Sequence, residues 1–366
     1  MKISEEQVIE VLQKVTYPGK GQDIISMEMV SDIQIEGSKL TFSLTFDKSN
    51  DPVIPSVRKA CVKAVQKYLG KDVEIEGNIQ IIAREVVTVD RILPDVKNII
   101  AVASGKGGVG KSTIAVNLAV AAVRLGYEVG LIDADIFGPS VPKMLKAENQ
   151  RPAVVVEDGK ELIVPVQSYG VNMLSIGFFV DPEDAVVWRG PMATGALKQF
   201  ITQTKWGELD YLFIDLPPGT SDIHLTMVQE VPVTGAVVVT TPQQVALADA
   251  LKGINMFRSD KIKVPVIGLV ENMAWFTPEE LPENKYYIFG REGGRELASK
   301  LNVPLLGQIP IVQGICEGGD QGKPIVLDAG SPVAAAFEEL AKNVIRETEK
   351  RNAELPPTKI VEITRK

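Results

Sequence analysis

Histidine and cysteine are almost absent from this chain of 366 residues, which has one histidine, His224, and two cysteines. A single imidazole excludes sites built from several histidines, such as the two-histidine zinc motif of metalloproteases. So few cysteines exclude a fold held together by many disulfides, and they favour a reducing compartment. A chain of this length is stabilised by hydrophobic cores instead.

The chain also lacks a long apolar run and an excess of positive charge. Charged residues or glycine interrupt every apolar stretch before about 18 residues, so we expect no transmembrane helix. The opening residues M-K-I-S-E-E-Q do not have the basic-then-apolar pattern of a targeting signal. Asp and Glu (47) outnumber Lys and Arg (39), which gives a net charge of −8. These features predict a cytoplasmic protein that binds neither nucleic acid nor membrane.

Hydrophobic patterning in residues 1–85 predicts a small α+β domain. The expected helices cover 3–15 and 56–69, and the expected strands cover 24–35, 39–46 and 73–82. Ser4 followed by Gln7 has the spacing of a capping box at the start of the first helix. A linker is expected over 86–98.

The pattern changes after the linker, where short apolar runs alternate with helical segments. The expected strands cover 99–103, 129–132, 211–214, 236–240 and 266–270. Continuous apolar strands are typical of a parallel sheet that helices cover on both faces. We therefore expect a doubly wound, mostly parallel α/β domain over 99–346 that ends in a helix around 331–346. A polar C-terminal tail is expected over 347–366.

A glycine-rich loop joins the first of these strands to a helix. It reads G-K-G-G-V-G-K-S-T, which is the P-loop pattern in its required strand–loop–helix context. Its backbone N–H groups would surround phosphate oxygens, while Lys111 would neutralise the β- and γ-phosphates and the Ser112 hydroxyl would bind Mg²⁺. The residues expected to bind the nucleotide here are Gly105, Lys106, Gly107, Gly108, Val109, Gly110, Lys111, Ser112 and Thr113.

Polar residues follow the other expected strands at the edge where a doubly wound sheet binds its ligands. Asp133 and Asp135 follow one strand, and Asp215 follows another in the Walker B pattern. These carboxylates either cap turns or hold hydrated Mg²⁺ and orient an attacking water. Asn272 either forms a turn or reads the edge of adenine. Lys106 is either a solvated charge or a contact to a phosphate in another subunit.

Together the motifs closely resemble those of the Mrp/ApbC family over residues 98–346. They are G-K-G-G-V-G-K-S-T, D-A-D-I-F-G-P-S, W-R-G-P-M, D-L-P-P-G-T-S-D and V-E-N-M-A-W-F. This family belongs to the deviant Walker A ATPases, with ParA, MinD and the nitrogenase iron protein. The first 85 residues resemble the MIP18-like domain that often precedes it. The resemblance implies a homodimeric ATPase, with ATP and Mg²⁺, that delivers iron–sulfur clusters to apoproteins.

The resemblance also implies roles for individual residues. Lys106 matches the lysine that contacts the nucleotide of the partner subunit, and Asp135 matches the aspartate that positions the hydrolytic water. Together with Lys111 and Asp215 they form the expected catalytic set. Asn272 matches the adenine-reading asparagine. The expected Mg²⁺ ligands are Ser112, Asp133 and Asp215.

The chain departs from the family pattern at the cluster site. The family carries C-x-x-C after E-N-M, where two subunits hold one [4Fe–4S] cluster between them, but residues 275–290 contain no cysteine. Cys61 lies on the apolar face of an expected helix and is predicted to be structural. Cys316, expected in a loop, is the remaining candidate ligand, although two copies supply only half of the usual thiolates. His224 is expected to be a helix or switch residue. The alternative function is therefore a cluster-free, ATP-switched dimeric adaptor or positioning protein.

Overall fold

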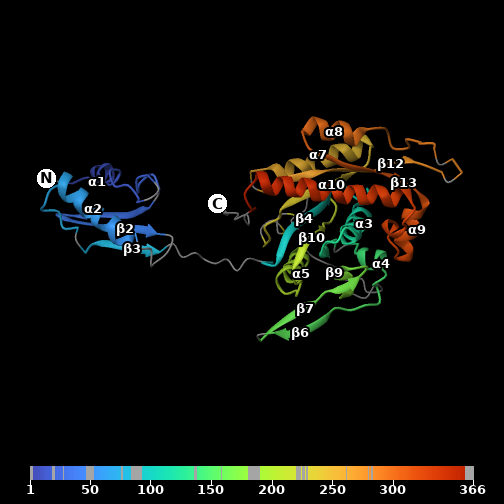
Figure 1. The fold of residues 1–366 in the computed structure, drawn as a ribbon, viewed down its shortest axis with the longest axis horizontal. Coiled ribbons are helices and arrows are strands. Elements are labelled where there is room, and N and C mark those ends of the chain that lie inside the picture. The colour runs from blue at the N-terminus through green and yellow to red at the C-terminus, as the bar shows by residue number, and fades with distance from the viewer. Residues whose placement is uncertain are drawn as a thin grey trace. The chain divides into compact units, whose positions relative to one another are not determined.

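The computed structural model describes residues 3–18, 21–27, 29–46, 53–75, 77–83, 93–135, 138–157, 159–179, 190–219, 224, 227, 230–260, 262–278, 280–281 and 283–358. The chain forms two compact units, Met1–Arg91 and Ile92–Lys366, which we describe separately (Figure 1). Most of the linker expected over 86–98 lies outside the described residues, and its last residues belong to the first strand of the second unit.

The first unit is the small α+β domain that the sequence predicts. Its elements are α1 (Glu5–Leu12), β1 (Val30–Glu36), β2 (Lys39–Phe46), α2 (Ile54–Tyr68) and β3 (Ile79–Ala83). The strands form a sheet in the order β1-β2-β3, antiparallel between β1 and β2 and parallel between β2 and β3. The expected order is confirmed, but β1 and β3 begin later than expected. Residues before β1 form turns in which Ile24 and Met29 are buried.

Local signals in this unit act as expected. The Ser4 hydroxyl accepts a bond from the Gln7 N–H, and the Gln7 side chain accepts one from the Ser4 N–H, so the capping box is confirmed. Cys61 lies on α2 and is completely buried among apolar side chains of both helices and the sheet. Burial raises the pKa of its thiol to about 12.

The second unit is built on an eight-stranded sheet. Its strand order is β13-β12-β11-β4-β10-β5-β9-β8, and all neighbouring strands are parallel except the terminal pair of β9 and β8. The strands are β4 (Val96–Ser104), β5 (Val129–Asp133), β8 (Val166–Ser168), β9 (Val171–Ser175), β10 (Leu209–Asp215), β11 (Gly235–Thr240), β12 (Val266–Phe276) and β13 (Leu305–Ile311). A separate hairpin joins β6 (Ala153–Glu157) to β7 (Lys160–Val164). The predicted α/β class is confirmed.

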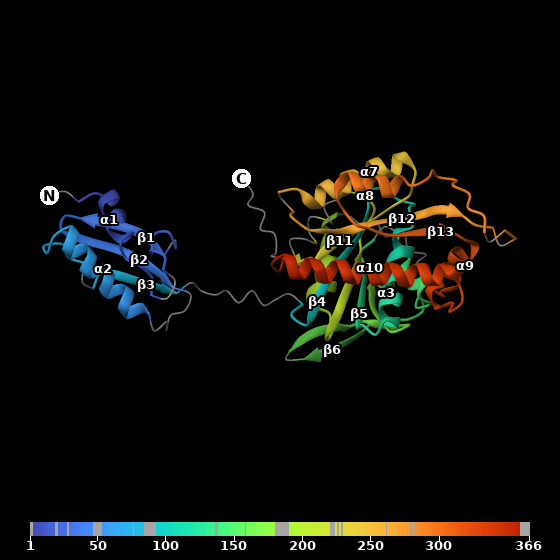
Figure 2. The same ribbon diagram turned by 45° about the horizontal axis from the view of Figure 1, so that its top comes forward.

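Helices cover both faces of this sheet because its strands are apolar on both sides. The helices are α3 (Lys111–Arg124), α4 (Val141–Met144), α5 (Gly190–Thr202), α7 (Gln244–Arg258), α8 (Gly293–Leu301), α9 (Gln313–Gln321) and α10 (Pro332–Glu354), with short 3₁₀ turns η1 (Ile176–Phe178) and η2 (Ile325–Leu327). In β4, Ile100 and Val102 face the cluster formed with α3 and α10, whereas Ile99 and Ala101 face the cluster formed with α5, α7 and α8. Figure 2 shows α10 and α7 on different sides of the sheet.

Two elements extend beyond their expected ends. The strand expected over 266–270 continues to Phe276, and the helix expected around 331–346 continues to Glu354. The first residues of the expected polar tail are therefore helical, and Thr348 is buried there. Residues 359–366 lie outside the described residues.

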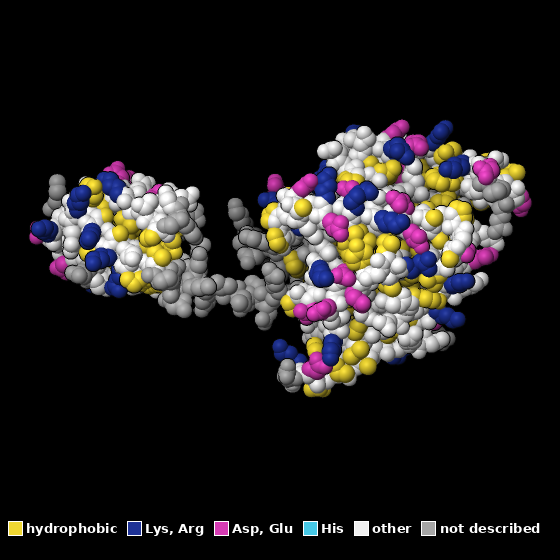
Figure 3. Space-filling view, in the orientation of Figure 1, with side chains coloured by type: hydrophobic (Ala, Val, Ile, Leu, Met, Phe, Trp, Pro, Cys, Tyr) yellow, Lys and Arg dark blue, Asp and Glu magenta, His cyan; other side chains and the backbone are white. Residues whose placement is uncertain are grey.

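The surface and the helices add two observations about the described residues. On the face that Figure 3 shows, basic and acidic side chains of the second unit are interspersed rather than gathered by sign. No helix in the described ranges is both long enough and apolar enough to cross a membrane.

The two thiols are expected to differ in reactivity. At pH 8, a pKa of about 12 leaves about one Cys61 in ten thousand as the reactive thiolate, and the side chain is inaccessible as well. Cys316 is exposed. Titration of the native protein with a chromogenic disulfide should therefore label one thiol per chain quickly and the second only after denaturation. The fast phase should disappear in Cys316→Ala. Equal fast labelling of both thiols would contradict the buried position of Cys61.

Candidate functional site

The P-loop connects the end of β4 to the start of α3, as the sequence predicts. Gly105 packs so closely on α7 that a Cβ there would lie 2.1 Å from the carbonyl carbon of Asp249. Gly110 has a φ of 79° and is the N-cap of α3. Because this helix begins at Lys111, its first N–H groups have no partner within the helix and are available to an anion.

Lys111 is buried in the site instead of extending into solvent. Its ammonium group lies 2.6 Å from Asp215 Oδ1 and 3.9 Å from Asp135 Oδ2, and it donates to the Ser112 hydroxyl at 3.3 Å. The side chain is 6% exposed, and that of Asp215 is fully buried. Burial raises the pKa of Asp215, and the charge of Lys111 opposes this rise. The ion pair thus compensates the cost of burying both charges.

Asp133 lies beside Asp215 on the neighbouring strand and is also fully buried. Its Oδ1 accepts a bond from the Asp135 N–H at 3.2 Å, and its Oδ2 accepts bonds from the Ser175 hydroxyl at 2.9 Å and the Val141 N–H at 3.3 Å. Burial, together with the nearby charge of Asp215, raises its pKa to about 7. Both of its oxygens accept bonds from protein donors, which hold the carboxylate in place beside Asp215.

The sequence analysis missed Ser175, which ends β9 and donates to Asp133. The Ser175 hydroxyl also accepts a bond from the Gly177 N–H at 3.0 Å, which fixes its orientation. The sequence does contain a pattern that could have identified Ser175, because a mostly apolar segment ends at this serine. A polar residue at the end of a buried strand marks the edge of the sheet where ligands bind.

Asp215 and Ser112 fit the binding of a divalent cation. Asp215 Oδ2 is buried and accepts no hydrogen bond within the described part of the chain. Ser112 follows Lys111 at the start of α3, and its hydroxyl is among the groups that oppose the rise in the pKa of Asp215. Mg²⁺ is typically held by one or two protein oxygens together with water and phosphate, so such a small ligand set is sufficient.

Asp135 and Lys106 lie at the same edge of the sheet. Asp135 has a side chain that is 16% exposed, at the mouth of the buried carboxylate cluster. Lys106 is half-buried within the P-loop, and its carbonyl accepts a bond from the Ser104 hydroxyl at 3.0 Å. The Ser104 carbonyl accepts a bond from the Gly219 N–H at 2.9 Å, which ties the P-loop to the loop after β10. Residues 220–223, which continue that loop, lie outside the described residues.

Asn272 is placed differently from the expectation. Because β12 continues to Phe276, Asn272 lies inside the strand and not at its end. Its side-chain nitrogen donates to the Val109 carbonyl of the P-loop at 2.8 Å. The preceding residue, Glu271, is fully buried and accepts bonds from the Gly294 N–H and, at 2.8 Å, from the Gln308 side chain.

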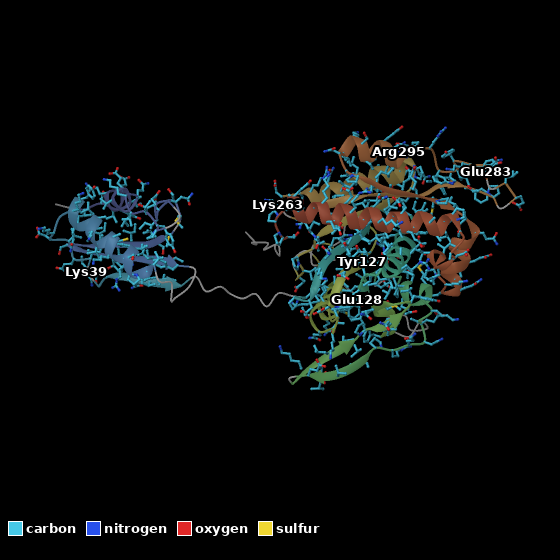
Figure 4. The ribbon with its side chains drawn as sticks, in the orientation of Figure 1. Lys39, Tyr127, Glu128, Lys263, Glu283 and Arg295 are labelled. Atoms are coloured by element: carbon cyan, nitrogen blue, oxygen red, sulfur yellow. The ribbon has the colours of Figure 1, made fainter. Side chains whose placement is uncertain are left out.

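The segment after β12 occupies the place of the family's cysteine pair. Phe276 and Tyr286 exchange backbone hydrogen bonds of 2.8 and 2.9 Å, which close the segment between them into a loop. This loop projects beyond the sheet in Figures 1 and 2, and Glu283 lies near its outer end in Figure 4. The ammonium group of Lys285 lies 3.9 Å from the ring centre of Trp275. Exposed apolar side chains are concentrated here, namely Leu281, Tyr286, Tyr287, Ile288 and Phe289.

The two cysteines belong to different units, and each of the two lies on a helix. Cys316 lies on helix α9, not in the expected loop, and its Sγ donates to Asp320 Oδ2 at 4.0 Å. Cys61 belongs to the core of the first unit, as expected. His224 is a buried helical residue, as expected. Across the described residues, no group of three or more His, Cys, Asp and Glu side chains is arranged to hold a metal ion.

Comparison with protein families matches both units. A model described as NUBPL iron-transfer P-loop NTPase matches residues 95–345. A second model, described as iron-sulfur cluster assembly protein, matches residues 5–76. The first model covers more than half of the chain.

Individual relatives extend this similarity to nearly the whole chain. An iron-sulfur cluster carrier protein of Synechocystis is 42% identical over 344 residues, which are 93% of this chain and 97% of the relative. The iron-sulfur cluster transfer protein NUBPL of Dictyostelium discoideum is 48% identical over 69% of this chain and 77% of its own length. A solved nucleotide-binding protein of Archaeoglobus fulgidus, in complex with ADP, is 37% identical with a TM-score of 0.57, covering 67% of this chain and 93% of that chain.

The raised pKa of Asp133 predicts a pH-dependent stability. Its carboxyl ionises near 3.8 when unfolded and near 7 when folded, so the native state binds more protons between these values. The group's contribution to stability is therefore full below pH 3.8 and is lost as the pH rises through 7. Without nucleotide or metal, the thermal midpoint of Asp133→Asn should fall less than that of the wild type between pH 5.5 and 8.

Asp210 provides the matched control for this measurement. It lies on β10 and, because it accepts bonds from Lys97 and the Glu128 N–H, its pKa is lowered. It therefore stays ionised over the same pH range in both states. Asp210→Asn should leave the change in midpoint between pH 5.5 and 8 as in the wild type. If the thermal midpoints of Asp133→Asn and the wild type fall by the same amount between pH 5.5 and 8, Asp133 is not the source of the pH dependence.

Proposed function

The chain belongs to the NUBPL iron-transfer P-loop NTPases, and from this premise we propose that it is an iron–sulfur cluster carrier driven by ATP hydrolysis. The Lys111–Asp215 pair carries the nucleotide part of the proposal, because it places the phosphate-neutralising cation and the acidic strand end in contact. The carrier part is supported by relatives of that name, which match over 92–93% of the chain.

Binding of a nucleoside triphosphate requires Lys111 to exchange partners. In the free site its ammonium group is held by Asp215 at 2.6 Å. A triphosphate at the N-terminus of α3 offers several negative oxygens to the same cation, and the N–H groups of the P-loop add hydrogen bonds. When Lys111 moves to the phosphates, Asp215 loses its counter-charge. A bound Mg²⁺ would replace that charge between Asp215 and Ser112 and would neutralise developing charge on the phosphates.

Asp135 is the residue best placed to direct water at the terminal phosphate. It borders the buried carboxylates but remains partly exposed, so a water molecule can reach it. Its backbone N–H is held by Asp133, and Ser175 holds Asp133 in turn. The carboxylate of Asp135 accepts a hydrogen bond from the water and thereby aligns its oxygen with the phosphorus.

Lys106 completes the proposed catalytic set through a second copy of the chain. It lies in the P-loop between β4 and α3. Its ammonium group can therefore contact only a phosphate that is bound close to this edge of the sheet. A homodimer that joins these edges places Lys106 of each subunit against the nucleotide of the other. Hydrolysis then weakens the contact, which couples nucleotide turnover to opening of the dimer.

Cys316 is the side chain of this chain that could bind an iron–sulfur cluster in the carrier proposal. Two copies of Cys316 supply two thiolates from exposed positions on α9. A client protein or a small thiol would complete the set. One observation favours the second candidate function, a cluster-free adaptor that ATP switches. The loop after β12 presents aromatic side chains where the family carries its cysteine pair.

Replacement of Lys106 tests the cross-subunit role. Lys106→Ala should lower the rate of ATP hydrolysis by about a hundredfold or more, because it removes one charge from the transition state. ATP binding to the single chain should change little, since Lys111 and the P-loop backbone remain. The assay measures phosphate release and, separately, equilibrium binding of ATP. Lys97→Ala, a change of an exposed lysine at the other end of β4, should leave both unchanged. Hydrolysis at the wild-type rate in Lys106→Ala would remove this role.

Anaerobic reconstitution tests the cargo. Iron and acid-labile sulfide are counted per dimer after desalting, for the wild type, Cys316→Ala and Cys61→Ala. The carrier function predicts about one four-iron cluster per dimer in the wild type. Cys316→Ala should lose it and Cys61→Ala should retain it, because Cys61 is buried in its own core. A wild-type protein that retains no iron but hydrolyses ATP would support the adaptor instead.

A further inference from the structure

Asn272 makes a specific contact with the P-loop that the nucleotide-binding motif does not require. Its side chain is 6% exposed, and its Nδ2 donates to the Val109 carbonyl at 2.8 Å. Val109 lies between Gly108 and Gly110, whose φ angles are 77° and 79°. The contact therefore falls on the part of the loop whose backbone is most tightly curved.

The loop and the amide group fit each other closely. A Cβ at Gly110 would lie 2.2 Å from Asn272 Nδ2, so no other residue fits at that position without moving the amide. The amide fills the space that a side chain at Gly110 would occupy. This fit ties the course of the loop to the position of β12.

Strand β12 has a bulge immediately after Asn272. In the pairing of β12 with β13, Asn272 lies opposite Ile309 and Phe276 lies opposite Ile311, so β12 has extra residues between the two pairs. Met273, within this bulge, has a left-handed φ of 55°. Such a conformation is costly for a residue with a side chain and is kept where the surroundings require it. Glu271 fixes the strand from its other side through Gly294 and Gln308.

The hydrogen bond has a consequence for phosphate binding. In a planar trans peptide, the carbonyl and the following N–H point in opposite directions. When Asn272 holds the Val109 carbonyl, the N–H of Gly110 is therefore turned to the opposite side. N–H groups of this loop are the donors that surround a phosphate. Without Asn272 this peptide is free to rotate, and a buried carbonyl is left without a partner.

We propose that Asn272 is a positioning residue that holds the Val109–Gly110 peptide in its phosphate-binding orientation. The inference rests on the proposed nucleotide-binding function and deepens it. The bond uses one N–H of the amide, so its effect is the same for every ligand that carries the polyphosphate group, whatever base is attached.

Inorganic tripolyphosphate is the probe that separates positioning from base reading. Calorimetry with Mg²⁺ compares tripolyphosphate, ATP and GTP on wild type, Asn272→Ala and Asn272→Asp. Loss of one hydrogen bond to a buried group should weaken the binding of tripolyphosphate about five- to tenfold, and ATP and GTP should each lose at least this factor. Asn272→Asp keeps the shape but puts an acceptor against the Val109 carbonyl, so its loss should be at least as large.

Asn343 supplies a matched control. Its Nδ2 also donates to a backbone carbonyl, that of Leu306 at 2.8 Å, but it lies on α10. Asn343→Ala should leave the affinity for tripolyphosphate unchanged. Thermal midpoints and circular dichroism test whether each variant is folded. If Asn272→Asp does not fold, Asn272→Ala alone is compared with the wild type.

Two results overturn the inference. One is an Asn272→Ala protein that binds tripolyphosphate as the wild type does. The other is an equal loss of affinity in Asn343→Ala, which would indicate general loosening of the fold. Failure of the wild type to bind both ATP and tripolyphosphate would instead refute the proposed function.

Discussion

The buried ion pair between Lys111 and Asp215 is the interaction on which the organisation of the site depends. It joins the first turn of α3 to the end of β10, so it fixes the P-loop helix against the sheet. Two buried charges are tolerated because each supplies the other's counter-charge. Asp133, Ser175 and the start of α3 are arranged around this pair. In the proposed mechanism, phosphate oxygens attract Lys111 and a cation restores the counter-charge of Asp215.

The remainder of the second unit holds these groups at one edge. All the strands that carry them are parallel neighbours, so their carboxyl ends meet at the same place. Apolar side chains on both faces of β4 and β10 fix the strands between two layers of helices. The buried carboxylates Asp133 and Asp215 are the last residues of their strands. This separation explains how a buried carboxylate cluster coexists with a continuous hydrophobic core.

Much of this arrangement is visible in the sequence, because local patterns and tertiary contacts agree. The P-loop, its flanking strand and helix, the carboxylates at the ends of β5 and β10, and the burial of Cys61 follow from spacing and apolar periodicity. The end of β12 does not, because the pairing with β13 extends a strand that turn-forming residues appeared to end. Ser175 and the bond from Asn272 to Val109 also depend on contacts between distant segments. Cys316 is expected in a loop before E-G-G-D, yet α9 forms there in spite of the glycines around it.

Because β12 is longer than its neighbour β11, its last residues and the loop that follows them are supported by β13 alone. Its last pair with β11 is Glu271 with Thr240, and from Asn272 to Phe276 it pairs with β13 alone. This end is a short, bulged two-stranded ribbon, which twists more readily than the middle of a sheet. Asn272 lies at its root and the aromatic side chains lie beyond its tip. Because displacement grows with distance from a pivot, any rotation of this ribbon about Asn272 would move Tyr286 and its neighbours farther than the P-loop contact itself.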